Sequence, residues 1–250
     1  EALVVTGNGI INFNGPANLS SNLKTAHLGV TGNINVNIGT GGNIVANTTG
    51  TAGWTSLATS IGDNVTLTLS GNGSYLTNLE LALDDVGSAI GVANATLLIS
   101  GTSSLTASDL WLSKGSTIDD NTVFYTSQVL QTGGNVTLTG NGSGLPGTGD
   151  NLIFGDRSGL VFGSASASYV LSGGNLITSG IIAGNLGNSG TAYLTLNGGV
   201  LMANANNTNY ISGLNAIIDS NGGAFINTNG FNITISQNLT HDTNGSLVDG

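Results

Sequence analysis

The sequence predicts an all-β fold in which a single chain winds into a solenoid of short strands. Three observations predict it: apolar and polar residues alternate in short runs, Gly-Gly corners recur, and charged residues are scarce. Charged residues make up 6% of the 250 residues, against about 25% in an ordinary globular domain. Gly, Asn, Ser, Thr and aliphatic residues dominate instead, a composition typical of repetitive β-structure.

Alternation of apolar and polar residues marks the expected strands. Each run has an apolar residue at every second position, the period of a half-buried strand. Gly-Gly, Asn-Gly and Ser-Gly breaks separate the runs and supply the backbone conformations that tight corners need. The clearest runs have apolar residues at Ile34, Val36 and Ile38; Val65, Leu67 and Leu69; Leu79, Leu81 and Leu83; Val136 and Leu138; Leu194 and Leu196; and Ile233 and Ile235.

The Gly-Gly corners favour a coil over a β-sandwich. In four segments a strand, a small polar residue and Gly-Gly precede a second strand, with first glycines at Gly133, Gly173, Gly198 and Gly222. The last two spacings are 25 and 24 residues, whereas the first is 40 and contains an expected loop insertion at 140–150. Repetition at this period predicts stacked turns, about ten rungs of roughly 22–25 residues. We expect one solenoid domain over 1–250, with its N-terminal rungs at 1–60 and clearer repeats at 61–250.

Stacking explains the composition. Each rung lies about 4.8 Å from the next, so equivalent side chains face each other. A charge would then face a like charge, whereas Asn side chains can hydrogen-bond from rung to rung. The chain has 33 asparagines, and we expect them to form such ladders.

Two segments predict short helical turns within the solenoid. Trp54, Leu57, Ala58 and Ile61 have helical spacing, and another turn is expected within Asn204–Asn215. Leu79, Leu81 and Leu83 alternate, which favours a strand there.

Composition excludes several classes of protein. Leu, Ile, Val and Phe make up 28% of the chain, above the roughly 20% that limits disordered proteins. It has no cysteine, which excludes disulfides and thiolate metal sites. The net charge is −10, and Lys24, Lys114 and Arg157 are the only Lys and Arg residues, so a nucleic-acid surface is excluded. No apolar run approaches the roughly 20 residues of a membrane span.

The last hundred residues resemble the autotransporter-associated β-strand repeats of exported bacterial surface proteins. The segments that carry the resemblance are 193–207 and 218–235, together with the Val170–Leu176 corner. The resemblance implies a right-handed parallel β-helix, export, and a role as a surface stalk, adhesin or passenger. It implies no catalytic residue.

Residues that could carry chemistry do not converge. Polysaccharide lyases and hydrolases on parallel β-helices need carboxylates and cations around the sugar. Asp84-Asp85 and Asp119-Asp120 are adjacent pairs, and adjacent residues on a strand point to opposite faces. His27 and His241 are far apart in the sequence. We therefore expect no catalytic, cofactor or metal site.

Calcium binding and glycosylation stay open. Gly147–Asp156 resembles one imperfect copy of a calcium-binding nonapeptide, a motif that needs stacked copies. Calcium at Asp84, Asp85, Asp119, Asp120 or Asp150 is neither predicted nor excluded. Asn-x-Ser/Thr sequences occur by chance in such a chain, so they do not by themselves predict glycosylation. Examples are at Asn18, Asn64, Asn94, Asn135 and Asn232.

We expect a non-enzymatic structural protein, secreted to the bacterial cell surface, that self-associates end to end into a filament. Its terminal segments, Ala2–Val5 with Ile10–Phe13 and Ile233–Val248, are predicted to be open sheet edges. The alternative is an adhesin or passenger stalk that binds surface glycans, and a polysaccharide lyase or hydrolase ranks third. Aromatic residues make up only 5% of the chain, which favours the structural role.

Overall fold

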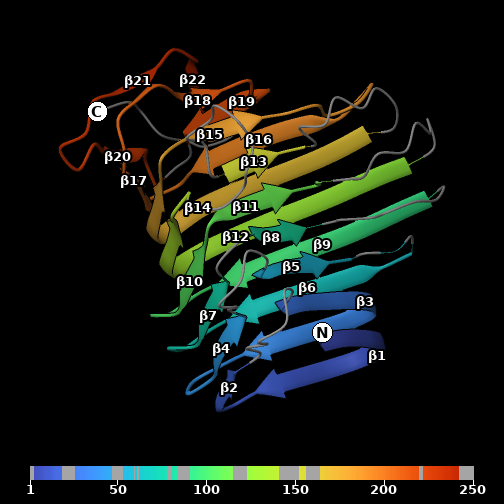
Figure 1. Cartoon of the computed structure of the whole chain (residues 1–250). Coiled ribbons are helices and arrows are strands. Elements are labelled where there is room, and N and C mark those ends of the chain that lie inside the picture. Colours follow the sequence, from blue (N-terminus) through green and yellow to red (C-terminus); the bar gives the residue numbers. More distant parts are fainter. Residues whose placement is uncertain are drawn as a thin grey trace.

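The computed structural model of the chain consists of strands connected by turns (Figure 1). It describes residues 3–18, 26–46, 53–58, 60, 62–77, 80–83, 91–114, 123–140, 152–155, 164–219 and 222–241. These ranges contain no helix, and every pairing between their strands is parallel. The predicted all-β class is therefore confirmed.

The strands form three stacks, called A, B and C, and successive strands along the chain belong to them in a repeating order. Stack A contains the long strands β1 (Leu3–Phe13), β3 (Ala26–Ile38), β6 (Asn64–Leu69), β9 (Gly91–Ile99), β12 (Val123–Leu138) and β14 (Ser164–Thr178), followed by β16 (Thr191–Leu196), β19 (Ala216–Asp219) and β22 (Leu239–His241). Stack B contains β2 (Pro16–Asn18), β4 (Asn43–Ala46), β7 (Ser74–Thr77), β10 (Ser104–Ala107), the last residues of β12 and β14, then β17 (Val200–Ala203) and β20 (Phe225–Asn227). Stack C contains the first residues of β1 and β3, then β5 (Gly53–Leu57), β8 (Glu80–Leu83), β11 (Asp109–Leu112), β13 (Leu152–Phe154), β15 (Ile181–Ala183), β18 (Asn207–Ser212) and β21 (Ile233–Ile235).

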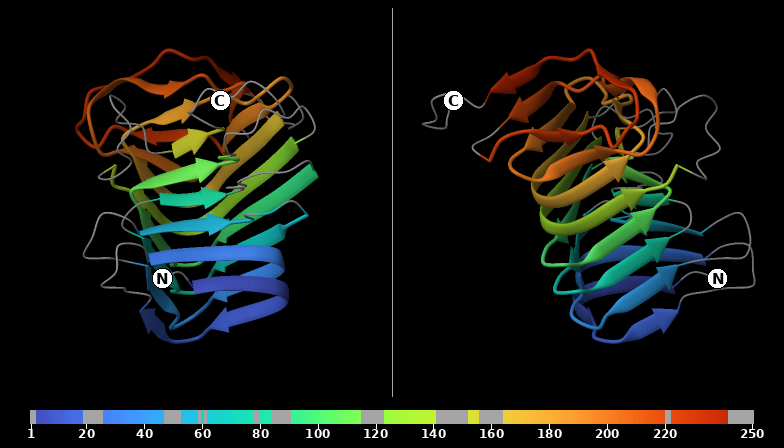
Figure 2. Two further views of the ribbon diagram at one scale, coloured as in Figure 1. Left: turned by 45° about the vertical axis from the view of Figure 1, so that its right-hand side comes forward. Right: turned by 90° about the vertical axis from the view of Figure 1, so that its left-hand side faces the viewer.

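Each strand pairs with the equivalent strand one turn later in the sequence. The stacks thus enclose a common interior, and Figure 2 shows them around it from two further sides. An all-β chain with parallel sheets in this arrangement is compatible with the predicted solenoid. The first and last described strands, β1 and β22, lie at opposite ends of the stacks (Figure 1).

The length of a turn changes along the chain. Asn8 and Asn33, which face each other, are 25 residues apart, Asn43 and Ser74 are 31 apart, and Asn135 lies 40 residues before its neighbour Asn175. Several segments between strands lie outside the described residues, among them 84–90, 115–122, 141–151 and 156–163. The predicted insertion at 140–150 lies in one of these segments, apart from Gly140. A single period of about 24 residues therefore holds only for part of the chain.

Alternate residues of the strands point into one continuous core. In β6, Val65, Leu67 and Leu69 are buried, whereas Asn64 is exposed and Thr66 is half-buried. Equivalent residues of successive turns contact each other along the interior. The period-two pattern of the sequence thus correctly indicates which side chains face inward.

Three tyrosines in this core keep their hydroxyl groups hydrogen-bonded. Tyr169 Oη donates to Gln131 Oε1 at 2.6 Å, and Tyr210 Oη donates to the Thr178 carbonyl oxygen at 3.3 Å. Tyr75 Oη bonds with Thr55 Oγ1. Burial raises the pKa of all three phenols well above their usual value. They are therefore neutral core residues rather than candidate acids.

Both predicted helical turns are wrong. Trp54 and Leu57 belong to strand β5, which pairs with β3 on one side and β8 on the other. The segment predicted within Asn204–Asn215 contains strand β18. Helical spacing over one or two turns is a weak signal, and hydrogen bonds to the neighbouring turns outweigh it.

Asparagine ladders are confirmed in stacks A and B. Asn33 Nδ2 donates to Asn8 Oδ1 at 3.1 Å, and Asn37 Nδ2 donates to Asn12 Oδ1 at 2.9 Å. In stack B, Asn175 Nδ2 donates to Asn135 Oδ1 at 2.7 Å. These bonds join the outward side chains of consecutive turns.

The Gly-Gly corners between stacks A and B leave no room for a side chain. Gly174 has φ of +71°, and a Cβ atom there would lie 2.0 Å from the carbonyl oxygen of Gly134, one turn away. At Gly222, a Cβ atom would lie 2.3 Å from the Asn197 carbonyl oxygen. Glycine is needed at these corners because two turns approach there backbone to backbone.

Three glycine variants separate close approach from backbone strain. Gly174→Ala introduces both, and we expect it to lower the free energy of unfolding by at least about 2 kcal/mol. Gly62 has φ of +86°, but a Cβ atom there would have no neighbour within 4 Å, so Gly62→Ala costs about 1 kcal/mol. Gly15 has neither feature, and Gly15→Ala is expected to change stability little. Urea unfolding followed by circular dichroism measures this order, and equal effects of Gly174→Ala and Gly15→Ala would contradict it.

Candidate functional site

Most of the residues that the sequence offered for chemistry lie outside the described residues. These are Asp84, Asp85, Asp119, Asp120 and Asp150, with Lys24 and Arg157. Of Gly147–Asp156, only residues 152–155 are described, and Leu152, Ile153 and Phe154 are buried in strand β13. No calcium site can be assembled from that segment's described part.

The two histidines are far apart in the fold. His27 lies in β3, near the first turn, and His241 lies half-buried in β22, in the last described turn. Among the described residues, no group of three or more His, Asp and Glu side chains is placed to hold a metal ion. The structure thus brings none of the described candidates together.

Asp63 is a buried carboxylate that the sequence analysis did not single out. Its Oδ1 accepts a hydrogen bond from the Gly32 amide at 2.6 Å, and its Oδ2 accepts one from the Ser60 amide at 2.8 Å. Its backbone carbonyl accepts from the Asn94 amide on the following turn at 2.9 Å. Asp63 therefore joins three consecutive turns at the corner before β6. A single aspartate between turn residues gives no distinctive signal in a sequence.

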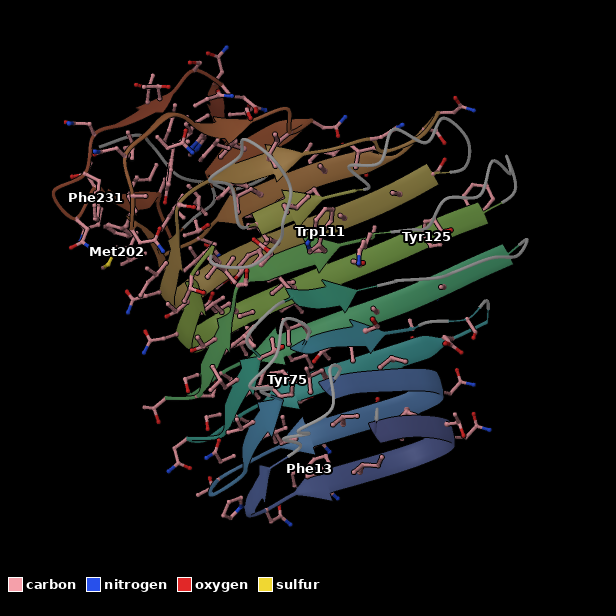
Figure 3. The ribbon with its side chains drawn as sticks, in the orientation of Figure 1. Phe13, Tyr75, Trp111, Tyr125, Met202 and Phe231 are labelled. Carbon is pink, nitrogen blue, oxygen red and sulfur yellow. The ribbon has the colours of Figure 1, made fainter. Side chains whose placement is uncertain are left out.

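A second apolar cluster lies on the outer side of stack C. Trp111 and Ile153 are buried there, and half-buried Ile182 packs against them. Lys114 Nζ lies 5.7 Å from the centre of the Trp111 ring, within the range of a cation–π contact. Trp111 Nε1 is buried and has no hydrogen-bond partner among the described residues. Figure 3 shows Trp111 on stack C, away from the labelled core residue Tyr75.

The first turn leaves inward apolar side chains partly uncovered. Ile11 and Phe13 point toward the core but are only half-buried. Their register partners one turn further in, Val36 and Ile38, are fully buried. Among the described strands, β1 and β2 each have a partner on one side only. Within the described part of the chain, this end therefore presents half-buried apolar side chains and a strand edge that has no described partner.

The last described turn has the same character. Leu239 is 42% exposed, whereas Ile217, its register partner on the preceding turn, is fully buried. In stack C, Ile235 is half-buried over fully buried Ile211. Figure 3 shows Phe13 and Phe231 toward opposite ends of the stacks. Strands β20, β21 and β22 also have one described partner each.

These two terminal turns are the candidate functional surfaces. Each has three strand edges, one per stack, around half-covered apolar residues. Such a surface is suited to bind another strand-bearing surface through backbone hydrogen bonds.

Comparisons with known proteins identify no relative. The sequence matches no family model, no curated protein and no solved structure. The autotransporter-associated repeat family thus stays a prediction from the sequence.

The described residues include no helix long and apolar enough to cross a membrane.

Two variants of Asp63 test its role at the corner. Asp63→Ala leaves the amides of Gly32 and Ser60 without their acceptor, and an unsatisfied buried donor costs about 1–3 kcal/mol. Asp63→Asn retains one acceptor oxygen, so we expect a smaller loss of stability. Urea unfolding gives both values. Wild-type stability of Asp63→Ala would show that the carboxylate does not join the turns.

Proposed function

We propose that this chain is a non-enzymatic extracellular structural protein that self-associates end to end into a filament or cell-surface fibre. In this proposal it is a right-handed parallel β-helix of about ten rungs. The observation that carries the proposal is the exposure of inward apolar side chains at both terminal turns, seen at Phe13 and Leu239.

The direction of the strands makes head-to-tail contact geometrically simple. A second copy shifted along the stack axis keeps every strand parallel to those it meets. Three pairings, one per stack, could then form at once and continue the existing pattern. Because the two surfaces differ, the contact is heterologous and adds copies without closing.

Low charge is compatible with this assembly. The net charge of −10 is spread along a body that we estimate at about 50 Å. Repulsion between neighbouring copies is largely screened at physiological salt, where the Debye length is about 8 Å.

Charged substitutions at the two ends test the proposal. We expect the native full-length protein to form filaments visible by electron microscopy, with a mass that rises with concentration. Phe13→Lys and Ile235→Lys each place a charge in one end surface and should block growth. Thr106→Lys is the control, because Thr106 lies half-buried on the outer side of β10.

Mixing the two end variants distinguishes the two surfaces. Each variant retains one intact end, so a mixture should form discrete dimers by sedimentation, while each variant alone stays monomeric. Native protein that remains monomeric at about 100 μM, well above typical assembly affinities, would contradict the proposal. Filaments unaffected by both end variants would instead indicate lateral contacts, and monomeric protein that binds surface glycans would favour the adhesin.

A further inference from the structure

The outer side of stack A carries a regular array of uncharged polar side chains. On β3, β6 and β9 the outward residues are Asn-Asn-Asn, Asn-Thr-Thr and Asn-Thr-Leu, at alternate positions of Asn33–Asn37, Asn64–Thr68 and Asn94–Leu98. We call these positions the polar array. The register aligns them in columns, so Asn35 lies next to Thr66, which lies next to Thr96.

The polar array repeats in two directions. Adjacent turns are about 4.8 Å apart, and alternate residues on a strand are roughly 6.6 Å apart. Figure 1 shows β3, β6 and β9 side by side, and their register keeps the rows aligned. This face differs from an ordinary sheet in that polar side chains occupy the repeated positions on three consecutive turns, with Leu98 the one apolar member.

The side chains of the array have little freedom to move. Asn33 and Asn37 are hydrogen-bonded to Asn8 and Asn12 on the neighbouring turn. The threonines are β-branched, which restricts χ1, and Thr66 and Thr96 are half-buried between their neighbours. Binding therefore loses little side-chain entropy.

The chemistry of the array limits its ligands. It has no charge to attract an ion or a polyelectrolyte, and no aromatic ring on which a sugar could stack. It offers hydroxyl and amide groups that each hydrogen-bond water, and methyl groups that lie between them. Water oxygens on a face of an ice crystal also repeat regularly in two directions.

We propose that the polar array binds ice. Its hydroxyl and amide groups hold a layer of water in a lattice that matches the crystal surface, and the array joins the crystal through that layer. This inference depends on the stacked strands and is independent of end-to-end assembly.

Two substitutions in one turn provide a matched test. Thr96 on β9 and Thr106 on β10 are both outward and half-buried, but only Thr96 belongs to the polar array. Tyrosine suits strands well, so both Thr96→Tyr and Thr106→Tyr should fold, as circular dichroism and thermal unfolding would check. A bulky ring at position 96 interrupts the array, whereas at position 106 it does not.

The measurements are the fraction of protein incorporated into a slowly growing ice hemisphere and the shape of single ice crystals. We expect wild type and Thr106→Tyr to enter the ice and to produce faceted crystals. Thr96→Tyr interrupts the array, so we expect the fraction of protein in the ice to fall roughly tenfold, in proportion to the loss of affinity. Leu98→Thr gives the β9 row of the array a third polar side chain and should increase the fraction of protein in the ice.

Exclusion of wild-type protein from the ice, to the level of an ordinary globular protein, would overturn the proposal. Equal effects of Thr96→Tyr and Thr106→Tyr would also overturn it, because the array would then have no special role. Binding to insoluble cellulose or chitin that Thr96→Tyr abolishes, without incorporation into ice, would assign the array to a polysaccharide instead.

Discussion

Parallel hydrogen bonding between successive turns is the constraint on which the rest of the structure depends. Each turn must lie one strand spacing from the next, so every position meets its own equivalent above and below. Backbone approaches backbone at the corners, which is why Gly174 lies where a Cβ atom would reach the Gly134 carbonyl. The alternation of the strands then sends one set of side chains into a common core and the other set outward.

The same constraint selects side chains that can stack on themselves. Aliphatic residues do so in the core, as Leu67 and Leu97 show, and asparagines do so outside, as Asn33 does on Asn8. A buried carboxylate needs hydrogen-bond donors, and Asp63 accepts from two backbone amides that lie on separate segments. The scarcity of charge thus follows from stacking. A regular outer surface follows from it too, because the side of a stack repeats from turn to turn.

Much of this fold could be predicted from the sequence, because its signals are local and repeated. Period-two alternation correctly indicates strands such as β6, and Gly-Gly correctly indicates the corners at Gly174 and Gly222. The helical spacing from Trp54 to Ile61 wrongly predicted a helical turn. Trp54 and Leu57 lie in strand β5, because hydrogen bonds with the neighbouring turns outweigh the spacing. The length of a turn differs along the chain, although the strands keep their parallel pairing. The role of Asp63 could not be predicted, because it depends on contacts between distant segments.

Disulfide formation between introduced cysteines tests the stacking of turns most directly, since the chain has no cysteine of its own. Asn35 and Thr66 are register partners on β3 and β6. The double variant Asn35→Cys/Thr66→Cys places its Cα atoms about 4.8 Å apart, within the range for a disulfide. In Asn35→Cys/Thr68→Cys the separation is about 8 Å, which is too far. Intramolecular oxidation of the first pair alone is the predicted result. Oxidation of the second pair, or of neither, would contradict parallel in-register stacking.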